Sequence, residues 1–254
     1  MKEQKIKDIE FAAGRWPLNP DLGTIVFIHG SGGTNILWQA QVESLADEMN
    51  TIALNLPGHG RSDGKGMSRM ADYANSVSGF IKSIDARTPV ICGLSIGGAI
   101  VLQLLIDEPE NYKAGIVVNA GAKLKVMPQL FETIEKDYPG FVNSMYSLGA
   151  SNKTDPAKIK PLADSMLLCP PEVTRKDFSA CDAFDVREKL NGINIPVLVM
   201  TASEDLLTPI KYGQFLRDRI PNAAMVNIED AGHLSPIEKP DNVASAIRAF
   251  IRTL

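Results

Sequence analysis

The segment 90–106 constrains the fold of this chain more than any other. It opens with an apolar run, passes through the sequence GLSIGG at 93–98, and continues with apolar residues at helical spacing. The pattern predicts a buried strand, a very tight turn and a helix, with Ser95 at the apex of the turn. Glycines on both sides suit such a turn, because a Cβ there would collide with adjacent backbone. The hydroxyl of Ser95 is therefore expected to project above the free N–H groups of a helix N-terminus.

The rest of the chain alternates between strand-like and helix-like segments. Apolar runs rich in β-branched residues predict strands at 24–28, 51–56, 114–119, 195–202 and 224–229, and an edge strand at 5–12. Helical spacing predicts helices at 35–48, 71–85, 209–219 and 236–253. Strands that alternate with helices predict an α/β fold, in which a mostly parallel sheet is covered on both faces.

The alternation stops between residues 121 and 186. Short amphipathic pieces at 127–138, 141–148, 156–168 and 171–178 are separated by proline and glycine, and none has the pattern of a strand. They hold too many apolar residues for a solvated linker. We expect a helical insertion at 121–186 within a single domain that spans residues 1–254.

Composition narrows the class of protein. A length of 254 residues suits one α/β domain with an insertion, and a net charge of −4 argues against a nucleic-acid partner. The first ten residues lack the apolar stretch of a signal peptide, and no apolar run is long enough to span a membrane. Three cysteines without CxxC spacing are expected to be reduced thiols. These features predict a cytoplasmic protein.

A serine nucleophile needs a base, and the chain holds three histidines. His29, His59 and His233 each follow an expected strand, so a parallel sheet would bring all three to the same edge. His233 alone follows a candidate acid in the chain order serine, acid, histidine. We therefore expect His233 to be the base, although a capping role remains an alternative. His29 is expected to support a glycine loop, and His59 a turn.

The acid that orients His233 is expected in the segment 201–209, directly after a strand. Asp205 and Glu204 both stand there. Asp205 is preferred because a short carboxylate at the apex of a loop points inward, whereas Glu204 is expected to be a solvated flank.

Attack on a carbonyl also needs donors for the negative charge that develops on oxygen. The N–H of Ile96, which follows the nucleophile, is one candidate, and the N–H of Ser31 is the second. Glycines at 30, 32 and 33 would let the backbone approach a substrate. The loop matches neither the GxGxxG nor the GxxxxGK[ST] phosphate-binding pattern, so a nucleotide ligand is not expected.

The motifs HGSGG, LPGHGRSD, GLSIGG, SEDLLTP and DAGHLSPIEKP resemble those of the α/β-hydrolase superfamily, specifically its small single-domain carboxylesterases. The resemblance covers almost the whole chain. It implies an eight-stranded sheet, a lid formed by residues 121–186, and a catalytic triad of Ser95, His233 and Asp205. Asn55 is a departure, since relatives often have aspartate there, and we expect it to affect the turn and not the chemistry.

The function implied is cleavage of a small neutral ester by two-step acyl transfer, with no metal or organic cofactor, in a monomer or homodimer. A haloalkane dehalogenase would need aspartate in place of Ser95. Two alternatives stay open within the fold, a lactonase and a carbon–carbon bond hydrolase. The latter shares Trp38 but usually has tryptophan where Leu234 stands. A third alternative is a hydrolase-like receptor with little turnover.

Substrate contacts are expected from the glycine loop, the insertion and the loops that carry the acid and the base. The candidates are Gly30, Gly32, Trp38, Met127, Phe131, Met145, Leu206 and Leu234. In the insertion, Leu130, Leu148, Met166 and Leu167 could equally line a pocket or form the insertion's own core.

Overall fold

The computed structural model describes residues 2–254 and contains one eight-stranded sheet with the strand order β1-β2-β4-β3-β5-β6-β7-β8. In this order every neighbouring pair from β4 to β8 is parallel, while β1 pairs antiparallel with β2 and β2 antiparallel with β4. The strands are β1 Lys2–Ile6, β2 Ile9–Ala13, β3 Thr24–Ile28, β4 Asn50–Leu54, β5 Val90–Leu94, β6 Ala114–Val118, β7 Val197–Ala202 and β8 Ala223–Ile228. The mostly parallel sheet expected from the alternating pattern is confirmed.

One strand prediction was wrong in detail. The segment 5–12 was expected to form a single edge strand, but it is part of a hairpin in which Ile6 of β1 pairs with Ile9 of β2. Lys7 lies between them with φ 50. The turn is formed by Lys7 and Asp8 without glycine or proline, so aspartate is its only typical turn residue.

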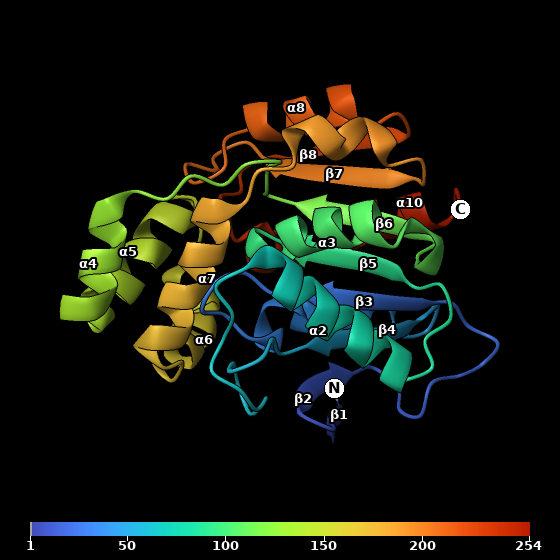
Figure 1. Cartoon of the computed structure of the whole chain (residues 1–254), viewed down its shortest axis with the longest axis horizontal. Helices are drawn as coiled ribbons and strands as arrows, with labels where there is room; N and C mark the ends of the chain where they lie inside the picture. Colours follow the sequence, from blue (N-terminus) through green and yellow to red (C-terminus); the bar gives the residue numbers. More distant parts are fainter. Residues whose placement is uncertain (1) are drawn as a thin grey trace.

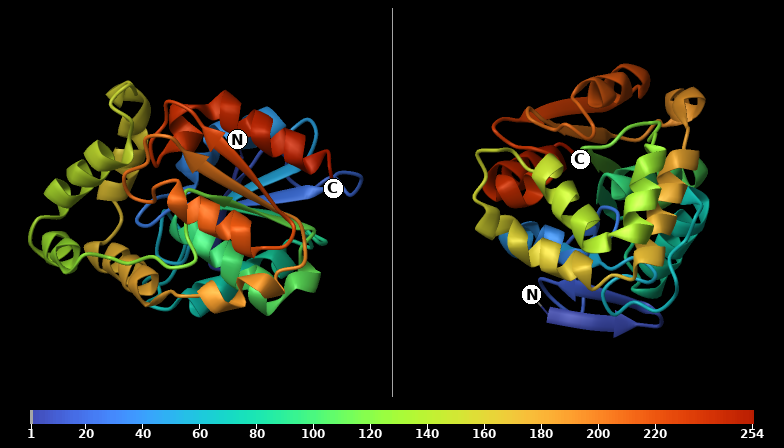
Figure 2. Two further views of the ribbon diagram at one scale, coloured as in Figure 1. Left: turned by 90° about the horizontal axis from the view of Figure 1, so that it is seen from above. Right: turned by 90° about the vertical axis from the view of Figure 1, so that its left-hand side faces the viewer.

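Helices cover both faces of the sheet (Figures 1 and 2). On one face α2 (Met70–Ser83), α3 (Ile96–Asp107) and α8 (Lys211–Arg219) join a large apolar core with residues such as Val26 and Ile91. On the other face η1 (Asn35–Trp38), α1 (Gln39–Leu45) and α10 (Pro240–Ile251) pack against residues such as Phe27 and Cys92. Strands β3, β5 and β6 are buried along their whole length, which explains their continuous apolar sequence.

Four helices lie to one side of the sheet, between β6 and β7 in the chain (Figure 1). They are α4 Pro128–Lys136, α5 Tyr138–Gly149, α6 Pro156–Leu167 and α7 Pro171–Ala183. They share a small apolar core of their own that includes Phe141 and Met166. The two ends of this insertion meet, because Lys123 and Asp185 form an isolated antiparallel bridge and an ion pair of 3.0 Å.

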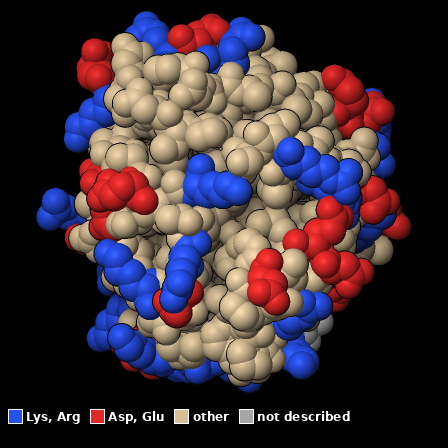
Figure 3. Space-filling view, turned by 90° about the vertical axis from the view of Figure 1, so that its right-hand side faces the viewer, with Lys and Arg blue, Asp and Glu red and all other residues tan. Residues whose placement is uncertain are grey.

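The remaining helices are short. They are η2 Pro109–Asn111, η3 Arg187–Gly192 and α9 Ser235–Glu238. Within residues 2–254, every helix is too short or too polar to cross a membrane. On the face turned away from the insertion, basic and acidic side chains are interspersed over the surface (Figure 3).

Candidate active site

Ser95 occupies the strand-to-helix turn that the sequence predicts. It lies between β5 and α3 with φ 58 and ψ −118, a strained conformation for a residue with a side chain. Its N–H donates to the carbonyl oxygen of Val118, at 3.0 Å. A Cβ on Gly93 would lie 2.1 Å from the carbonyl oxygen of Gly97, and a Cβ on Gly97 would lie 2.4 Å from that of Ile28. Both glycines are therefore required by the close approach of β5, α3 and β3.

His233 and Asp205 are hydrogen bonded, with 2.9 Å between Nδ1 and Oδ2. They come from the loops after β8 and β7. The Asp205 carboxylate also accepts from the N–H of Leu207 at 2.8 Å, and from the N–H and hydroxyl of Thr208 at 2.9 and 2.7 Å. Burial alone would raise the pKa of Asp205, but the His233 ring and the two Thr208 donors hold the pKa below its usual value. Asp205 is therefore an ionised, well-oriented partner of His233.

Glu204 faces a different part of the molecule. Its carboxylate forms an ion pair of 2.6 Å with Lys153 and accepts from the hydroxyl of Ser151. Both partners follow α5 in the insertion, so Glu204 fastens the insertion to the loop after β7.

Two buried polar residues fix the backbone around His233. The amide of Asn119 donates to the carbonyl oxygen of His233 at 2.9 Å. The carboxylate of Glu238, 3% exposed, accepts from the N–H of Gly232 at 3.0 Å and from the N–H of Ser151 at 2.8 Å. Sequence reasoning missed both residues, since neither stands in a catalytic motif and their partners are distant in the chain.

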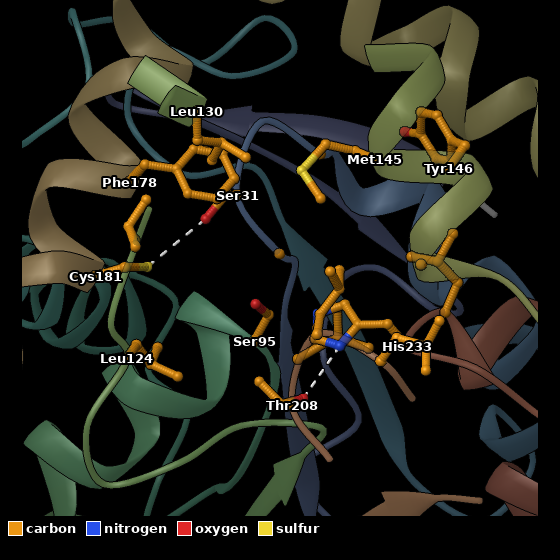
Figure 4. A pocket seen from close by; sticks show the side chains of 18 of the residues that line it. Ser31, Ser95, Leu124, Leu130, Met145, Tyr146, Phe178, Cys181, Thr208 and His233 are labelled. Atoms are coloured by element: carbon orange, nitrogen blue, oxygen red, sulfur yellow. Dashed lines mark hydrogen bonds between the residues drawn. The ribbon is translucent and has the colours of Figure 1, made fainter. Parts of the chain in front are cut away.

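Ser95 and His233 open into a common cavity of about 310 Å³ (Figure 4). Residues of the loops after β3, β5, β7 and β8 line it, together with residues of α4, α5, α6 and α7. In Figure 4, Ser95 lies between the side of the cavity that holds Ser31 and Cys181 and the side that holds His233. Five of the expected substrate contacts line this cavity, namely Gly30, Met127, Met145, Leu206 and Leu234.

Three expected contacts do not line the cavity. Trp38 is 0% exposed and stacks on Phe27 with 5.0 Å between ring centroids, so it belongs to the core beneath the sheet. Phe131 lies under the guanidinium of Arg175, 5.7 Å from the ring centroid. Gly32 packs against the insertion, where a Cβ would lie 2.5 Å from Met166.

The insertion contributes both cavity wall and surface. Leu130 and Met166 line the cavity, whereas Leu148 and Leu167 are exposed. Sequence reasoning did not select several residues that also line it. The aromatic members of this group are Tyr146, Phe178 and Tyr212, and Leu124 also belongs to it. Tyr146 and Phe178 stand in apolar patterns that predicted helices but not the direction that each side chain takes.

Of the two residues whose N–H groups are expected to stabilise an oxyanion, Ser31 lines the cavity, and Ile96 directly follows Ser95, which also lines it. The loop at 30–33 is closed by a hydrogen bond of 3.0 Å from the N–H of Gly33 to the carbonyl oxygen of Gly30. The N–H of Gly32 is also occupied, because it donates to Asp177 at 2.8 Å. Among the residues that the structure describes, the N–H groups of Ser31 and Ile96 have no protein acceptor.

The other two histidines lie beneath this loop. His29 donates from Nδ1 to the carbonyl oxygen of Gly30 at 2.8 Å, and its Nε2 accepts from the N–H of Leu56 at 3.0 Å. Burial and the nearby His59 lower the pKa of His29 to about 3, so the ring is neutral. The expected supporting role of His29 is confirmed.

Asn55 stands before the turn that follows β4, where its side chain accepts from the N–H of Asn35 at 2.7 Å and donates to Glu10 at 2.8 Å. An aspartate at this position would face the Glu10 carboxylate.

Within the described part of the chain, no cluster of histidine, cysteine and acidic side chains has the arrangement of a metal site. A serine on a strained strand-to-helix turn and an acid–histidine pair on later strand ends, on a parallel sheet, define a hydrolase of the α/β class.

The comparisons with known proteins agree with this class. The model of the alpha/beta hydrolase family matches residues 25–246, and the chain belongs to that family. It is a hydrolase. Among curated proteins it is 28% identical to 3-oxoadipate enol-lactonase 1 of Acinetobacter baylyi, over 91% of this chain and 89% of that protein. It is 24% identical to the pimeloyl-[acyl-carrier protein] methyl ester esterase of Nitrosomonas europaea, over 91% of this chain and 95% of that protein.

Solved structures show the same fold. The enol-lactonase from Burkholderia xenovorans aligns with a TM-score of 0.90 at 21% identity, covering 99% of this chain and 100% of that chain. A thermophilic esterase aligns with a TM-score of 0.85 at 28% identity, covering 99% of this chain and 97% of that chain. The eight-stranded sheet implied by the resemblance to the α/β-hydrolase superfamily is confirmed.

Proposed function

We propose that this chain is a serine esterase that hydrolyses small neutral carboxylic esters by two-step acyl transfer. The observation that carries the proposal is the common cavity. Ser95, on its strained turn, and His233, hydrogen bonded to Asp205, both open into it. The ester and lactone hydrolysis in the names of the similar proteins supports this reaction class. The free thiols Cys92, Cys169 and Cys181 support a reducing, cytoplasmic location.

In the proposed reaction, the hydroxyl oxygen of Ser95 attacks the ester carbonyl carbon while Nε2 of His233 takes the hydroxyl proton. Nε2 is the nitrogen that serves because Nδ1 is bound to Asp205, whose charge stabilises the imidazolium. The N–H groups of Ser31 and Ile96 donate to the developing oxyanion. The carbon–oxygen bond to the alcohol then breaks, and His233 returns the proton to the leaving oxygen. Water, activated by His233 in the same way, releases the acid and restores Ser95.

A lactonase is a second candidate, favoured by the enol-lactonase among the similar proteins. A lactone is an internal ester, so the same residues would act and the leaving alcohol would stay attached to the acyl group. The carbon–carbon bond hydrolase loses support, since the Trp38 side chain that suggested it is buried outside the cavity.

The test is turnover of nitrophenyl esters, lactones and vinylogous diketones side by side, by the native chain and by Ser95→Ala. We expect many turnovers per chain on esters, and less than about a thousandth of that rate in the variant. A native chain that stops after a single turnover would instead be a receptor. A Ser95→Ala variant that keeps its rate would overturn the assignment of the nucleophile.

A further inference from the structure

Asp177 in α7 is an acidic side chain with no exposure to solvent, and it lies outside the proposed triad. Its carboxylate receives three hydrogen bonds from residues outside the insertion. Oδ2 accepts from the N–H of Gly32 at 2.8 Å and from Nε2 of His59 at 2.9 Å. Oδ1 accepts from the hydroxyl of Tyr73. One carboxylate of the insertion thus ties together the loop after β3, the loop after β4 and helix α2.

The partner that balances this buried charge is His59. Both of its ring nitrogens face acceptors, the carbonyl oxygen of Pro57 at 3.3 Å and Asp177 at 2.9 Å, so both nitrogens carry hydrogen and the ring is an imidazolium. Burial alone would lower the pKa of His59, but the Asp177 carboxylate outweighs burial and raises the pKa to about 10. The neighbouring ring of His29, 4.8 Å away between centroids, is neutral and adds no second positive charge.

The hydrogen bond from Gly32 sets the orientation of the loop at 30–33. Gly32 has φ 65, and its N–H points away from the cavity toward Asp177. The peptide between Ser31 and Gly32 is thereby held in one direction, and Gly33 closes the turn on Gly30. The N–H of Ser31 remains for an oxyanion. A buried N–H without an acceptor is unfavourable, so the loop would turn if the carboxylate were removed.

We propose that Asp177 is a positioning residue that orients the oxyanion loop through Gly32, with His59 as its counter-ion, which makes helix α7 of the insertion a working part of the active site. This inference rests on the proposed function, since it requires that Ser31 serve an oxyanion. It explains why the insertion carries a fully buried acid 145 positions from its partner Gly32.

The test compares Asp177→Asn with Glu172→Gln, which makes the same charge change on an exposed residue of the same helix. We expect Asp177→Asn to lower kcat about tenfold to a hundredfold with less than about a twofold change in KM, because displacement of an oxyanion donor costs transition-state stabilisation. Binding of an aryl trifluoromethyl ketone, which forms a charged tetrahedral adduct, should weaken by the same factor. Glu172→Gln should match the native chain in each measurement.

A purely structural role for Asp177 predicts a different result. The Asp177→Asn variant would then melt at a lower temperature while kcat and ketone affinity stayed native, and this outcome overturns the inference. If the native chain turns over esters and Asp177→Asn has the same kinetics, the inference is overturned but the proposed function is not. Absence of turnover in the native chain overturns the proposed function, and with it the oxyanion role of Asp177.

NMR of the native chain provides a second arm if Asp177→Asn fails to fold. At about pH 8, above the usual histidine pKa, the ¹⁵N shifts of His59 should be those of a doubly protonated ring. The Gly32 amide proton should lie downfield, as expected for a hydrogen bond to a carboxylate. A neutral His59 ring or an ordinary Gly32 amide shift would overturn the proposal.

Discussion

Glu204 forms an ion pair with Lys153, with 2.6 Å between Nζ and Oε1, and does not contact His233. Its neighbour Asp205 points the other way and holds Nδ1 of His233. The adjacent carboxylates of Glu204 and Asp205 therefore have different structural roles. One fastens the insertion at the surface, and the other orients the proposed base beneath it.

This division predicts opposite outcomes for two conservative substitutions. Asp205→Asn should lower kcat by about 10³–10⁴-fold, because the imidazole loses both its orienting acceptor and its charge partner. Glu204→Gln should stay within a fewfold of the native kcat, since the Glu204 carboxylate contacts Lys153 and Ser151 and not His233. Steady-state kinetics on one nitrophenyl ester measures both, and the reverse ranking would mean that the acid has been misassigned.

The His59–Asp177 pair predicts a loss of stability at alkaline pH. The pKa of His59 is raised in the folded chain, so the pair stabilises the fold fully below the unfolded pKa of about 6.5, and this stabilisation is lost as pH rises through about 10. The groups that face His59 are Asp177, His29 and Cys169. We expect the melting temperature of the native chain to fall more between about pH 7 and pH 10.5 than that of Asp177→Asn. Parallel curves would show that His59 is not charged in the folded chain.

The sheet could be predicted from the sequence because its central strands are buried on both faces. A short run rich in β-branched residues such as Thr24–Ile28 is typical of a strand buried on both faces, and it forms β3 with those bounds. The elbow followed from steric necessity, since Gly93 and Gly97 admit no Cβ. The hairpin at Lys7 could not be predicted, because a lysine stands at the position with φ 50, where glycine or asparagine is usual, and Asp8 alone does not define a turn.

The site was less predictable than the fold, because an apolar side chain near the cavity can either line the cavity or pack in the core. Trp38 follows the glycine loop and could face the cavity, but the 3₁₀ turn η1 directs it onto Phe27. Asp177 has no local signal at all. It stands in a helix as many solvated acids do, and its partners His59 and Gly32 are 118 and 145 positions away. Only the packing of the insertion on the sheet brings them together.

A pair of glycine substitutions tests the packing of the elbow. A Cβ at Gly97 would lie 2.4 Å from the carbonyl oxygen of Ile28 and 2.8 Å from that of His29, so Gly97→Ala must push α3 away from β3. We expect a loss of about 1–3 kcal/mol in the free energy of unfolding and a large loss of activity. Gly79→Ala, at an exposed position of α2 with no atom within 4 Å of the added Cβ, should instead gain about 0.5–1 kcal/mol. Urea unfolding measures both, and equal effects would contradict the steric account.

The charge of the cavity wall predicts which esters the enzyme prefers. Among the described residues that line the cavity, Lys125 is the sole lysine or arginine, and none is acidic. Lys125 lies at the rim, where its side chain is 69% exposed and forms an ion pair of 2.7 Å with Asp182. A substrate carboxylate inside the cavity would lose its hydration without gaining a free cation. Two nitrophenyl esters of equal acyl length, one neutral and one ending in a carboxylate, should therefore differ about tenfold or more in kcat/KM, in favour of the neutral ester.

A rise in ionic strength from about 0.01 to 0.5 M should barely change kcat/KM for the neutral ester, because no long-range attraction guides it. Lys125→Gln serves as the control and should leave the preference intact. If the carboxylate ester were the better substrate, with a rate that falls with salt and is lost in Lys125→Gln, then Lys125 would exchange Asp182 for the substrate, and the preference for neutral esters would be wrong.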